Sequence, residues 1–380
     1  MQGRIDPTDD ERFMARALEL ARHGLGLASP NPMVGAVVVA DGRVVGEGWH
    51  RGPGTEHAEV VALTAAGARA AGATLYVTLE PCSHHGRTPP CAPRVVDAGI
   101  TRVVAATGDP NPSVDGRGFG LLRAAGVAVA VGVLEASAGQ LIEGFATAVT
   151  RGTPFVTLKM ASSLDGKVAA VDGSSRWITG EEARRDVHRL RAEHDAVLVG
   201  AGTALADDPA LTVGLDGYAG RLPLRVVLDT SGRVAATGAL FDGSAPTLVA
   251  TTARSPAWAR EAWAAAGARV LVVADDGAGG ADLTVLLKHL AGGHDDLPPI
   301  RSILIEGGPT LAWSAVREGI VDRFVFYLAP KLVGGRDAPG SLSGDGIATI
   351  ADAVPLEIGS VEMVGGDVRI VARPRPVEGE

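Results

Sequence analysis

Hydrophobic and polar positions in the first 150 residues switch between helical and strand periodicity. Thr8 and Glu11 form a capping-box pattern ahead of apolar residues at helical spacing, which predicts a helix ending near Gly24. Two β-rich runs are joined by Asp41-Gly42, a dipeptide typical of a tight hairpin. The elements expected are helices at 8–24, 55–70, 93–98 and 118–125 and strands at 34–40, 43–49, 73–79, 102–107 and 127–133. A hairpin followed by alternating strands and helices predicts a three-layer α/β domain around a mixed sheet.

The pattern starts again near residue 151. Pro154 interrupts an apparent helix, and a new strand is expected from Phe155. The elements expected here are strands at 155–160, 196–200, 224–229, 247–251, 268–273, 302–306 and 323–328 and helices at 181–192, 257–266, 283–290 and 310–318. The sequence therefore predicts two α/β domains, at residues 1–150 and 151–380, because 380 residues exceed what one hydrophobic core usually carries.

Composition and charge argue against several classes of protein. The formal net charge of −9 argues against a general nucleic-acid binder, because affinity for phosphate backbones needs clustered positive charge. The longest uncharged stretch, residues 24–40, contains two prolines, whereas a membrane-spanning helix needs roughly 20 continuous apolar residues. The first dozen residues are highly charged and lack the apolar region of a secretory signal. We therefore expect a cytoplasmic protein with neither nucleic acid nor a membrane as its partner.

The chain has only two cysteines, Cys82 and Cys91, in a loop rich in proline and histidine. A disulfide framework would need more pairs and an oxidising compartment. A redox pair is normally separated by two residues, and this pair is separated by more. Metal binding is therefore the leading interpretation of the pair.

A histidine near the start of an expected helix completes a set of metal ligands. His57, Cys82 and Cys91 supply three zinc ligands, and three protein ligands leave a fourth position open for water. Zinc lowers the pKa of a bound water to near 7, and Glu59 is the candidate to carry its proton to a leaving amine. This His-x-Glu and Pro-Cys arrangement is the signature of zinc deaminases.

Two points leave this interpretation open. Positions i and i+2 of a helix point roughly 200° apart, so periodicity alone does not place His57 and Glu59 around one metal. They converge only if both lie at the very start of the helix. The alternative is a closed structural zinc site, in which His84 or His85 would supply the fourth ligand.

The same motifs resemble the deaminase half of the bifunctional riboflavin-biosynthesis deaminase/reductase family (RibD). The resemblance lies in His57-Ala58-Glu59, in the long loop from Pro81 to Cys91, and in residues 30–37 and 48–50. It implies a cytidine-deaminase-like fold and a phosphoribosyl-pyrimidine substrate, with Asn31, His50 and Arg87 in contact with that substrate. Arg87 stands where lysine is common in the family. Taken on their own, the two residues favour simpler interpretations, Asn31 as a turn residue between two prolines and His50 as a surface histidine.

The second half has no Gly-x-Gly-x-x-Gly motif, so a typical dinucleotide-binding fold is not indicated. Residues 303–311 instead form a strand, a tight Gly-Gly turn and a helix with Pro309 near its start. Such a junction exposes backbone N–H groups at the positive end of a helix dipole, which suits a phosphate group. Residues 197–203 are a weaker version of this junction. A Gly-Gly turn is also common for packing alone.

Residues 159–166, 175–179, 207–212 and 306–310 resemble successive blocks of the reductase half of the same family. The resemblance implies a fold similar to dihydrofolate reductase and NADPH as the cofactor. The residues that the resemblance places in contact with the cofactor are Ala161, Trp177, Thr203, Asp207, Thr230, Gly308, Pro309, Thr310, Leu311, Ala312, Trp313 and Ser314. It places near the substrate Ser175, Arg191, Leu211, Glu306 and, on the first strand, Lys159. Arg191 would be a suitable partner for the ribose 5-phosphate.

The reductase half departs from its relatives at one position. After Leu211 relatives commonly carry an arginine that helps to hold the substrate, and this chain has Gly214 instead. Either Arg221 or Arg225 compensates, or phosphate binding is weaker. The individual residues also have simpler interpretations: Trp177 as core, residues 207–209 as a turn, and Arg191 as a solvated helix charge.

The resemblance covers almost the whole chain and implies a zinc-dependent and NADPH-dependent bifunctional enzyme. The first half would remove the 2-amino group of 2,5-diamino-6-(5-phosphoribosylamino)pyrimidin-4-one, and the second would reduce the ribosyl group to ribityl. No single general acid is evident for the reduction. We also expect a homo-oligomer. Two alternatives remain: a deaminase of nucleic acids or free bases fused to an inactive binding domain, and a non-enzymatic scaffold with a structural zinc.

Overall fold

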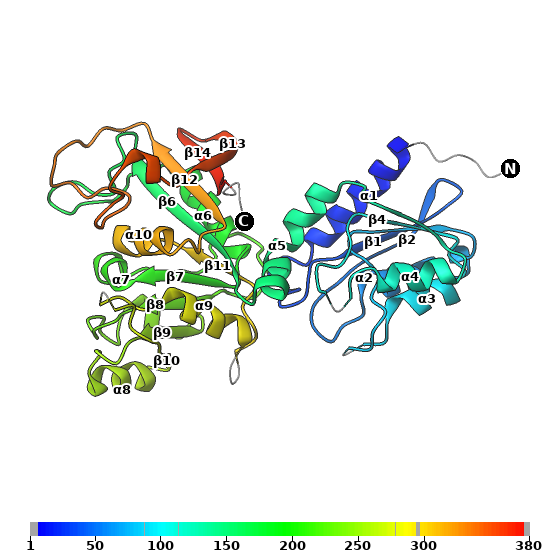
Figure 1. Ribbon diagram of the computed structural model, residues 1–380, viewed down its shortest axis with the longest axis horizontal. Coiled ribbons are helices and arrows are strands. Elements are labelled where there is room, and N and C mark those ends of the chain that lie inside the picture. The colour runs from blue at the N-terminus through cyan, green and yellow to red at the C-terminus, as the bar shows by residue number, and fades with distance from the viewer. Residues whose placement is uncertain (1–6, 87, 113, 278, 294–296, 376–380) are drawn as a thin grey trace. The chain divides into compact units, whose positions relative to one another are not determined.

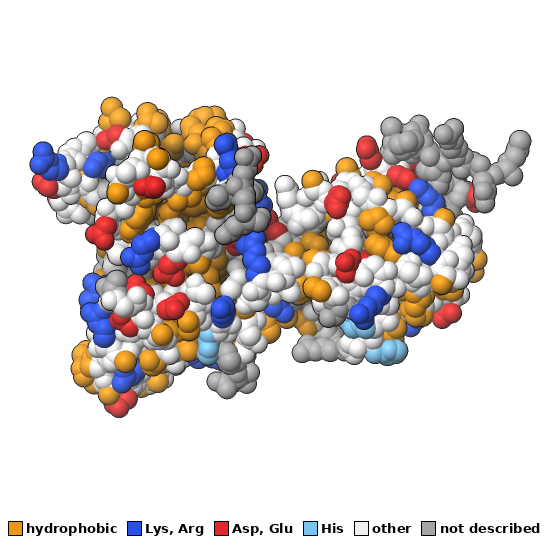
Figure 2. Space-filling model, in the orientation of Figure 1, with side chains coloured by type: hydrophobic (Ala, Val, Ile, Leu, Met, Phe, Trp, Pro, Cys, Tyr) orange, Lys and Arg blue, Asp and Glu red, His pale blue; other side chains and the backbone are white. Residues whose placement is uncertain are grey.

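In the computed structural model, residues 7–86, 88–112, 114–277, 279–293 and 297–375 are described. The chain folds into two compact units, Met1–Gly152 and Thr153–Glu380, which are called the first and the second unit below (Figure 1). On the face shown in Figure 2, acidic and basic side chains are interspersed over the surface of both units. No helix in the described ranges combines the length and the apolar character that crossing a membrane requires.

The first unit is a five-stranded mixed sheet in the order β2-β1-β3-β4-β5. Its strands are β1 (Gly35–Ala40), β2 (Arg43–Trp49), β3 (Thr74–Val77), β4 (Arg102–Ala105) and β5 (Ala128–Val131). Its helices are α1 (Pro7–Arg22), α2 (Ala58–Ala66), η1 (Gly67–Ala70), α3 (Cys91–Asp97), α4 (Arg117–Ala124) and α5 (Glu135–Arg151). Strands β1 and β2 form the antiparallel hairpin predicted from Asp41-Gly42, and β3, β4 and β5 run parallel. The predicted three-layer α/β architecture is confirmed.

Alternating side chains of the strands face two separate hydrophobic cores. Val37 and Val39 pack with α1 and α5, whereas Val38 packs with α2, α3 and α4. Gly48 on β2 allows the start of α2 to approach the sheet, because a Cβ atom there would lie 2.4 Å from the carbonyl oxygen of Ala58. The beginning of α2, which carries the predicted zinc-site residues, is therefore fixed directly against the sheet.

The second unit is a nine-stranded sheet in the order β10-β9-β8-β7-β11-β6-β12-β14-β13. Its strands are β6 (Phe155–Ser163), β7 (Ala196–Gly200), β8 (Leu224–Leu228), β9 (Thr247–Thr251), β10 (Arg269–Val272), β11 (Ser302–Ile305), β12 (Arg323–Ala329), β13 (Leu356–Val364) and β14 (Asp367–Pro374). Its helices are α6 (Glu181–Ala192), α7 (Ala201–Asp207), η2 (Ala239–Phe241), α8 (Ala257–Ala265), α9 (Leu283–Gly292), α10 (Pro309–Arg317) and η3 (Ile350–Asp352). Helices α9 and α10 cover one face of the sheet, and α6 and α7 cover the other.

Several predicted elements need correction. The first helix begins at Pro7, so Thr8 lies inside it rather than at its cap, and α2 begins at Ala58, three residues later than predicted. The start of helix α7 agrees with the weaker strand-to-helix junction expected at 197–203, whereas the β13–β14 hairpin was not expected from the sequence. Apolar and polar residues alternate at 356–358 and again at 361–363 of β13, but a β-bulge between Ile358 and Ser360 shifts the alternation, so the sequence shows no continuous strand pattern there.

Candidate active sites

The three predicted metal ligands meet at one point of the first unit. His57 is the residue before α2, Cys82 lies in the loop after β3, and Cys91 is the first residue of α3. Nδ1 of His57 lies 3.1 Å from Sγ of Cys91 and 3.6 Å from Sγ of Cys82, and the three donor atoms all lie within 4.8 Å of one another. Ligands around a tetrahedral zinc ion are roughly 3.5 Å apart when Zn–N and Zn–S bonds are about 2.0 and 2.3 Å long. The spacing and the chemistry of these donors fit zinc.

The difficulty of placing His57 and Glu59 on one helix disappears in the structure. The backbone of His57 is extended (φ −73°, ψ 159°), so this residue precedes the helix and the 100° rotation per residue does not apply to it. Glu59 lies in the first turn of α2 and is 4% exposed. Its carboxyl group interacts with the Cys91 thiol and with the charges of His57 and Cys82. Both side chains therefore face the sulfur atoms of the two cysteines.

The environment of Glu59 suits a group that exchanges protons. Burial raises the pKa of its carboxyl group to about 7, although the positive charge of His57 opposes this shift. A carboxyl group with this pKa is able to accept and to donate a proton near neutral pH. Asp, Glu, His and Cys side chains in the described ranges add no fourth member to the three-donor cluster. His84 and His85 are exposed, which does not support the closed structural zinc site.

His50 and Asn31 form a hydrogen-bonded pair beside the metal ligands. His50 is 3% exposed, so it is not a surface histidine, and its ring packs edge-on at 5.3 Å from that of His57. The Asn31 amide nitrogen lies 3.0 Å from Nε2 of His50, and the carbonyl oxygen of Glu56 lies 3.2 Å from Nδ1. With the amide donating to Nε2, Nδ1 carries the ring hydrogen and donates to Glu56. Arg87 lies outside the described residues.

Glu80 was missed at the level of sequence, although it lies directly before Pro81-Cys82. It is 3% exposed, and its carboxylate accepts hydrogen bonds from the backbone N–H groups of Gly116, Gly118 and Phe119 at 3.0, 2.8 and 3.2 Å. These bonds tie the loop that carries Cys82 to the start of α4. The only signal in the sequence was an acidic residue at the end of an apolar strand.

In the second unit, charged residues distant in the sequence meet at the end of β11. Glu306 forms a bidentate pair with Arg191 of α6, with Nε–Oε1 and Nη2–Oε2 distances of 2.5 and 2.8 Å. A further guanidinium nitrogen of Arg191 donates to the carbonyl oxygen of Thr212 at 3.1 Å. The Arg191 side chain is only 15% exposed, so it is not a solvated helix charge. Lys159 lies near this pair, and burial lowers its pKa.

The two predicted strand-to-helix junctions lie side by side, because β7 and β11 are neighbouring parallel strands. The Gly308 backbone N–H donates to the Thr203 hydroxyl at 2.8 Å, which links the start of α10 to α7. Leu311 and Ala312 are buried in the core, whereas Thr310 is exposed. Part of the segment 308–314 therefore packs into the core, and the start of α10 is accessible.

The remaining predicted contacts have mixed environments. Trp177 is 62% exposed with the Arg184 guanidinium 4.5 Å from its ring, so it is not core. Leu211 is buried in the core, and its backbone has a positive φ of 52°. Ala161, Ser175, Asp207 and Thr230 are half-buried. In the 207–209 segment, the Asp208 carboxylate accepts from the Ala239 N–H at 2.8 Å, and the Asp207 carbonyl oxygen accepts from the Arg176 guanidinium at 2.6 Å.

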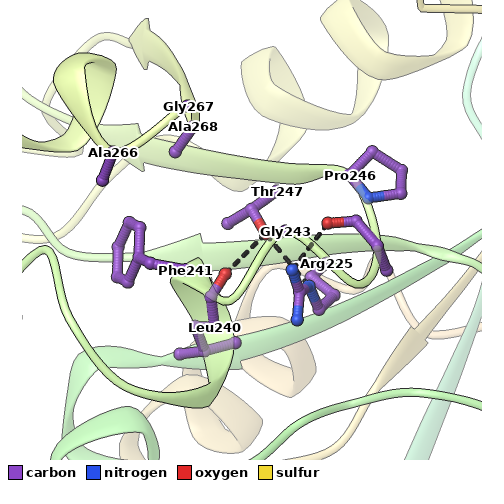
Figure 3. Close-up of a pocket in the computed structure, with 10 residues that line it drawn as sticks. Arg225, Leu240, Phe241, Gly243, Pro246, Thr247, Ala266, Gly267 and Ala268 are labelled. Carbon is purple, nitrogen blue, oxygen red and sulfur yellow. Dashed lines mark hydrogen bonds between the residues drawn. The ribbon is translucent and has the colours of Figure 1, made fainter.

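The structure contradicts the suggestion that Arg225 compensates for Gly214. Arg225 is wholly buried beside a pocket of about 200 Å³, where its guanidinium donates to the Thr247 hydroxyl (Figure 3). It also donates to the carbonyl oxygens of Ala239 and Ala245. These bonds use its guanidinium to hold the segment between β8 and β9 together.

His188 of α6, rather than Arg225, lies beside Gly214. The Gly214 N–H lies 2.9 Å from Nδ1 of His188, and a Cβ atom at position 214 would lie 3.0 Å from the imidazole ring. Arg221 is exposed. His188 is one helical turn before Arg191, so the two side chains share a face of α6. The motif blocks did not include His188, and nothing else in the sequence indicated it.

Two family descriptions match the chain. Residues 7–107 match the cytidine and deoxycytidylate deaminase zinc-binding region, and residues 154–370 match the RibD C-terminal domain. The riboflavin biosynthesis protein RibD of Escherichia coli is 44% identical over 94% of this chain and 98% of its own length. The RibD of Mycobacterium tuberculosis is 41% identical over 96% of this chain and 97% of its own length.

Solved structures agree with these matches over nearly the full chain. A structure of Acinetobacter baumannii RibD is similar with a TM-score of 0.87 and 39% identity, over 98% of this chain and 100% of that one. A structure from Thermotoga maritima, described as a diaminohydroxyphosphoribosylaminopyrimidine deaminase/5-amino-6-(5-phosphoribosylamino)uracil reductase, has a TM-score of 0.85 and 37% identity, over 97% and 99% of the two chains.

Proposed function

Because the chain belongs to the RibD family, with a deaminase domain followed by a reductase domain, we propose that it performs two consecutive steps on one phosphoribosyl-pyrimidine. The first unit hydrolyses the 2-amino group of 2,5-diamino-6-(5-phosphoribosylamino)pyrimidin-4-one and releases ammonia. The second unit reduces the ribosyl group of the product to ribityl with NADPH. The observation that carries the proposal is the convergence of His57, Cys82 and Cys91 beside the buried carboxyl group of Glu59.

In the deamination, His57, Cys82 and Cys91 would hold a zinc ion, which acidifies a water molecule when bound. Glu59 takes a proton from the attacking water and later delivers it to the departing amino nitrogen. The water oxygen replaces that nitrogen on the ring carbon, and ammonia leaves. Burial of Glu59 supports this role, because it keeps the pKa of the carboxyl group near the pH of the reaction.

The substrate of this unit would contact Asn31, His50 and Arg87. Both ring nitrogens of His50 already have protein partners, so His50 contributes by holding the Asn31 amide in one orientation. An amide fixed in this way offers its carbonyl oxygen to an amino group of the pyrimidine. Arg87 would supply a positive charge to the phosphate.

In the reduction, hydride would pass from NADPH to C1 of the opened ribosyl group, and a proton would be added to the attached nitrogen. The cofactor would lie along the paired junctions at Thr203 and Gly308 and contact Ala161, Trp177, Asp207, Thr230 and residues 309–314. The accessible start of α10 supports this assignment, because helix N-termini favour phosphate groups.

The substrate of the reductase would contact Ser175, Arg191, Leu211 and Glu306, with Lys159 near the reacting sugar. The pairing of Arg191 with Glu306 gives this site a fixed charged centre, and Lys159 adds positive charge beside it. His188 lies next to Gly214, where relatives carry arginine, and would provide a ring donor in place of that guanidinium.

We further propose that the protein is a cytoplasmic homo-oligomer. Strand β13 is at the edge of its sheet and exposes Ile358, Val361 and Met363 to 61, 59 and 66%, and Figure 2 shows apolar side chains on the surface of this region. Exposed edge strands with apolar side chains favour pairing with a second copy.

One assay of purified protein tests the proposed function. Zinc content, ammonia release from the diamino substrate and NADPH oxidation with the deaminated product are measured on the same preparation. We expect about one zinc per chain and both activities. Oxidation of NADPH would exclude a deaminase fused to an inactive domain, and zinc without ammonia release would favour the non-enzymatic scaffold and contradict the proposal.

A further inference from the structure

The loop between Cys82 and Cys91 brings a hydroxyl group to the imidazole of His57. Oγ1 of Thr88 lies 3.1 Å from Nε2 of His57. The other ring nitrogen, Nδ1, faces the two sulfur atoms at 3.1 and 3.6 Å. The two nitrogens of the ring therefore have different partners: Nδ1 has the metal-binding sulfurs, and Nε2 has an uncharged oxygen.

These positions determine how the ring hydrogen must be placed. A histidine that binds a metal is neutral and uses an unprotonated nitrogen. Since Nδ1 is the nitrogen that faces the cysteines, the single ring hydrogen must be on Nε2. A threonine hydroxyl has two lone pairs and accepts this hydrogen. We propose that Thr88 is a positioning residue that holds His57 in the Nε2–H tautomer, with Nδ1 directed to the metal; this inference rests on the proposed zinc-dependent deaminase.

The inference gives part of the long loop a function. His84 and His85 are exposed and add no ligand, so only the two cysteines of the described part of the loop would coordinate the metal. The backbone of Thr88 accepts a hydrogen bond from the Gly86 N–H at 3.2 Å, which helps to fix the turn that presents the hydroxyl. Outer partners of metal-bound histidines orient the ring, and their loss typically lowers metal affinity by about 10–100-fold.

The experiment measures zinc affinity rather than activity. Purified full-length protein is stripped of metal and titrated with Zn²⁺ in competition with a chromophoric chelator. Thr88→Val, which keeps the shape and removes the acceptor, is compared with Thr88→Ser, which keeps the hydroxyl. Thr64→Val, the same change at an exposed position of α2, is the matched control. Circular dichroism and the urea unfolding transition of the first unit report whether each variant is folded.

We expect Thr88→Val to bind zinc about 10–100-fold more weakly, while Thr88→Ser and Thr64→Val remain within about threefold of the wild type. Wild-type affinity in Thr88→Val would overturn the inference and leave the deaminase assignment intact. Failure of the wild type to bind zinc would overturn both.

A second measurement does not depend on a variant that folds. In zinc-loaded wild-type protein with ¹⁵N-labelled histidine, the His57 ring is expected to carry its hydrogen on Nε2 and to bind the metal through Nδ1. Metal binding through Nε2 would overturn the inference, because Thr88 could not then accept a ring hydrogen.

Discussion

The proposed catalytic centres of the two units are assembled in different ways. In the first unit, His57, Glu59, Cys82 and Cys91 come from two short motifs at the starts of α2 and α3. In the second unit, the central pair joins Arg191 and Glu306, which are 115 residues apart in the chain. A site built from local motifs is visible in the sequence. A site built from long-range pairs becomes visible only when the sheet has placed its strands.

The largest difference between the centres is expected from removing a metal ligand. Cys82→Ala should abolish ammonia release, because two remaining ligands hold zinc poorly. Reduction of the deaminated substrate should persist, since the residues proposed for the reductase site all belong to the second unit. Both products are measured by chromatography, and treatment of the wild type with a chelator should reproduce the pattern. Loss of both activities in a folded variant would contradict the division of labour.

Glu59→Gln should retain zinc but lose deaminase activity by about 10²–10⁴-fold, because the amide cannot carry a proton. Zinc content and kcat for ammonia release separate this effect from loss of the metal. Glu56→Gln changes an exposed neighbour in the same way and should leave kcat unchanged. Normal turnover in Glu59→Gln would remove Glu59 from the mechanism.

In the second unit, substitution of Arg191 is expected to affect both stability and substrate binding. Arg191→Ala leaves the carboxylate of Glu306, whose side chain is 7% exposed, without its partner and should destabilise this unit by about 3–5 kcal/mol. Arg191→Lys keeps the charge without the bidentate fork and should raise KM for the reductase substrate. Urea unfolding and steady-state kinetics test these outcomes, with unchanged zinc binding as the control for the first unit. If Arg191→Ala left the stability of the second unit unchanged, the pair would not be needed for its fold.

The pH dependence of this pair has a definite sign. Burial alone would raise the pKa of Glu306, but the facing Arg191 guanidinium lowers it below the ordinary 4.5. The stabilisation is therefore complete above the pKa of the unfolded state and is lost as the pH falls through the lowered value. Acid unfolding of the second unit should begin at higher pH in Arg191→Lys than in the wild type. An unchanged acid transition would contradict the pairing.

A smaller effect is expected at Glu80. Glu80→Gln replaces a carboxylate that accepts several backbone hydrogen bonds and should destabilise the first unit by about 1–3 kcal/mol. Zinc should also dissociate faster, because the loop with Cys82 is less firmly held. Urea unfolding followed by zinc release measures both quantities, and Glu56→Gln again serves as the exposed control. Unchanged stability would mean that solvent satisfies the freed N–H groups.

The smallest effect is expected at the exposed histidines of the loop. His84→Ala and His85→Ala should change zinc affinity by less than about twofold, because surface substitutions are usually worth under 0.5 kcal/mol. A loss of affinity beyond tenfold in either variant would restore the closed structural zinc site and remove the open position that hydrolysis needs.

The sequence alone determined the order of most elements, the mixed α/β sheet of the first unit and the three residues proposed to bind its metal. The periodicity of apolar residues records which face of a helix or strand is buried, so it predicts the elements. The residues proposed for the metal site lie in short motifs next to a strand end or a helix start, so they can be recognised from their spacing. The β13–β14 hairpin escaped this reasoning because a β-bulge between Ile358 and Ser360 shifts the alternation of apolar and polar residues within β13.

Only the tertiary structure decided which charged groups work together. It paired Arg191 with Glu306, assigned Arg225 to the fold rather than to the ligand, and brought Thr88 to His57. It also showed that His57 precedes α2, which the helical period could not indicate. Hydrogen bonds and ion pairs of this kind depend on distances of about 3 Å between atoms on separate elements, and spacing along the chain does not record such distances.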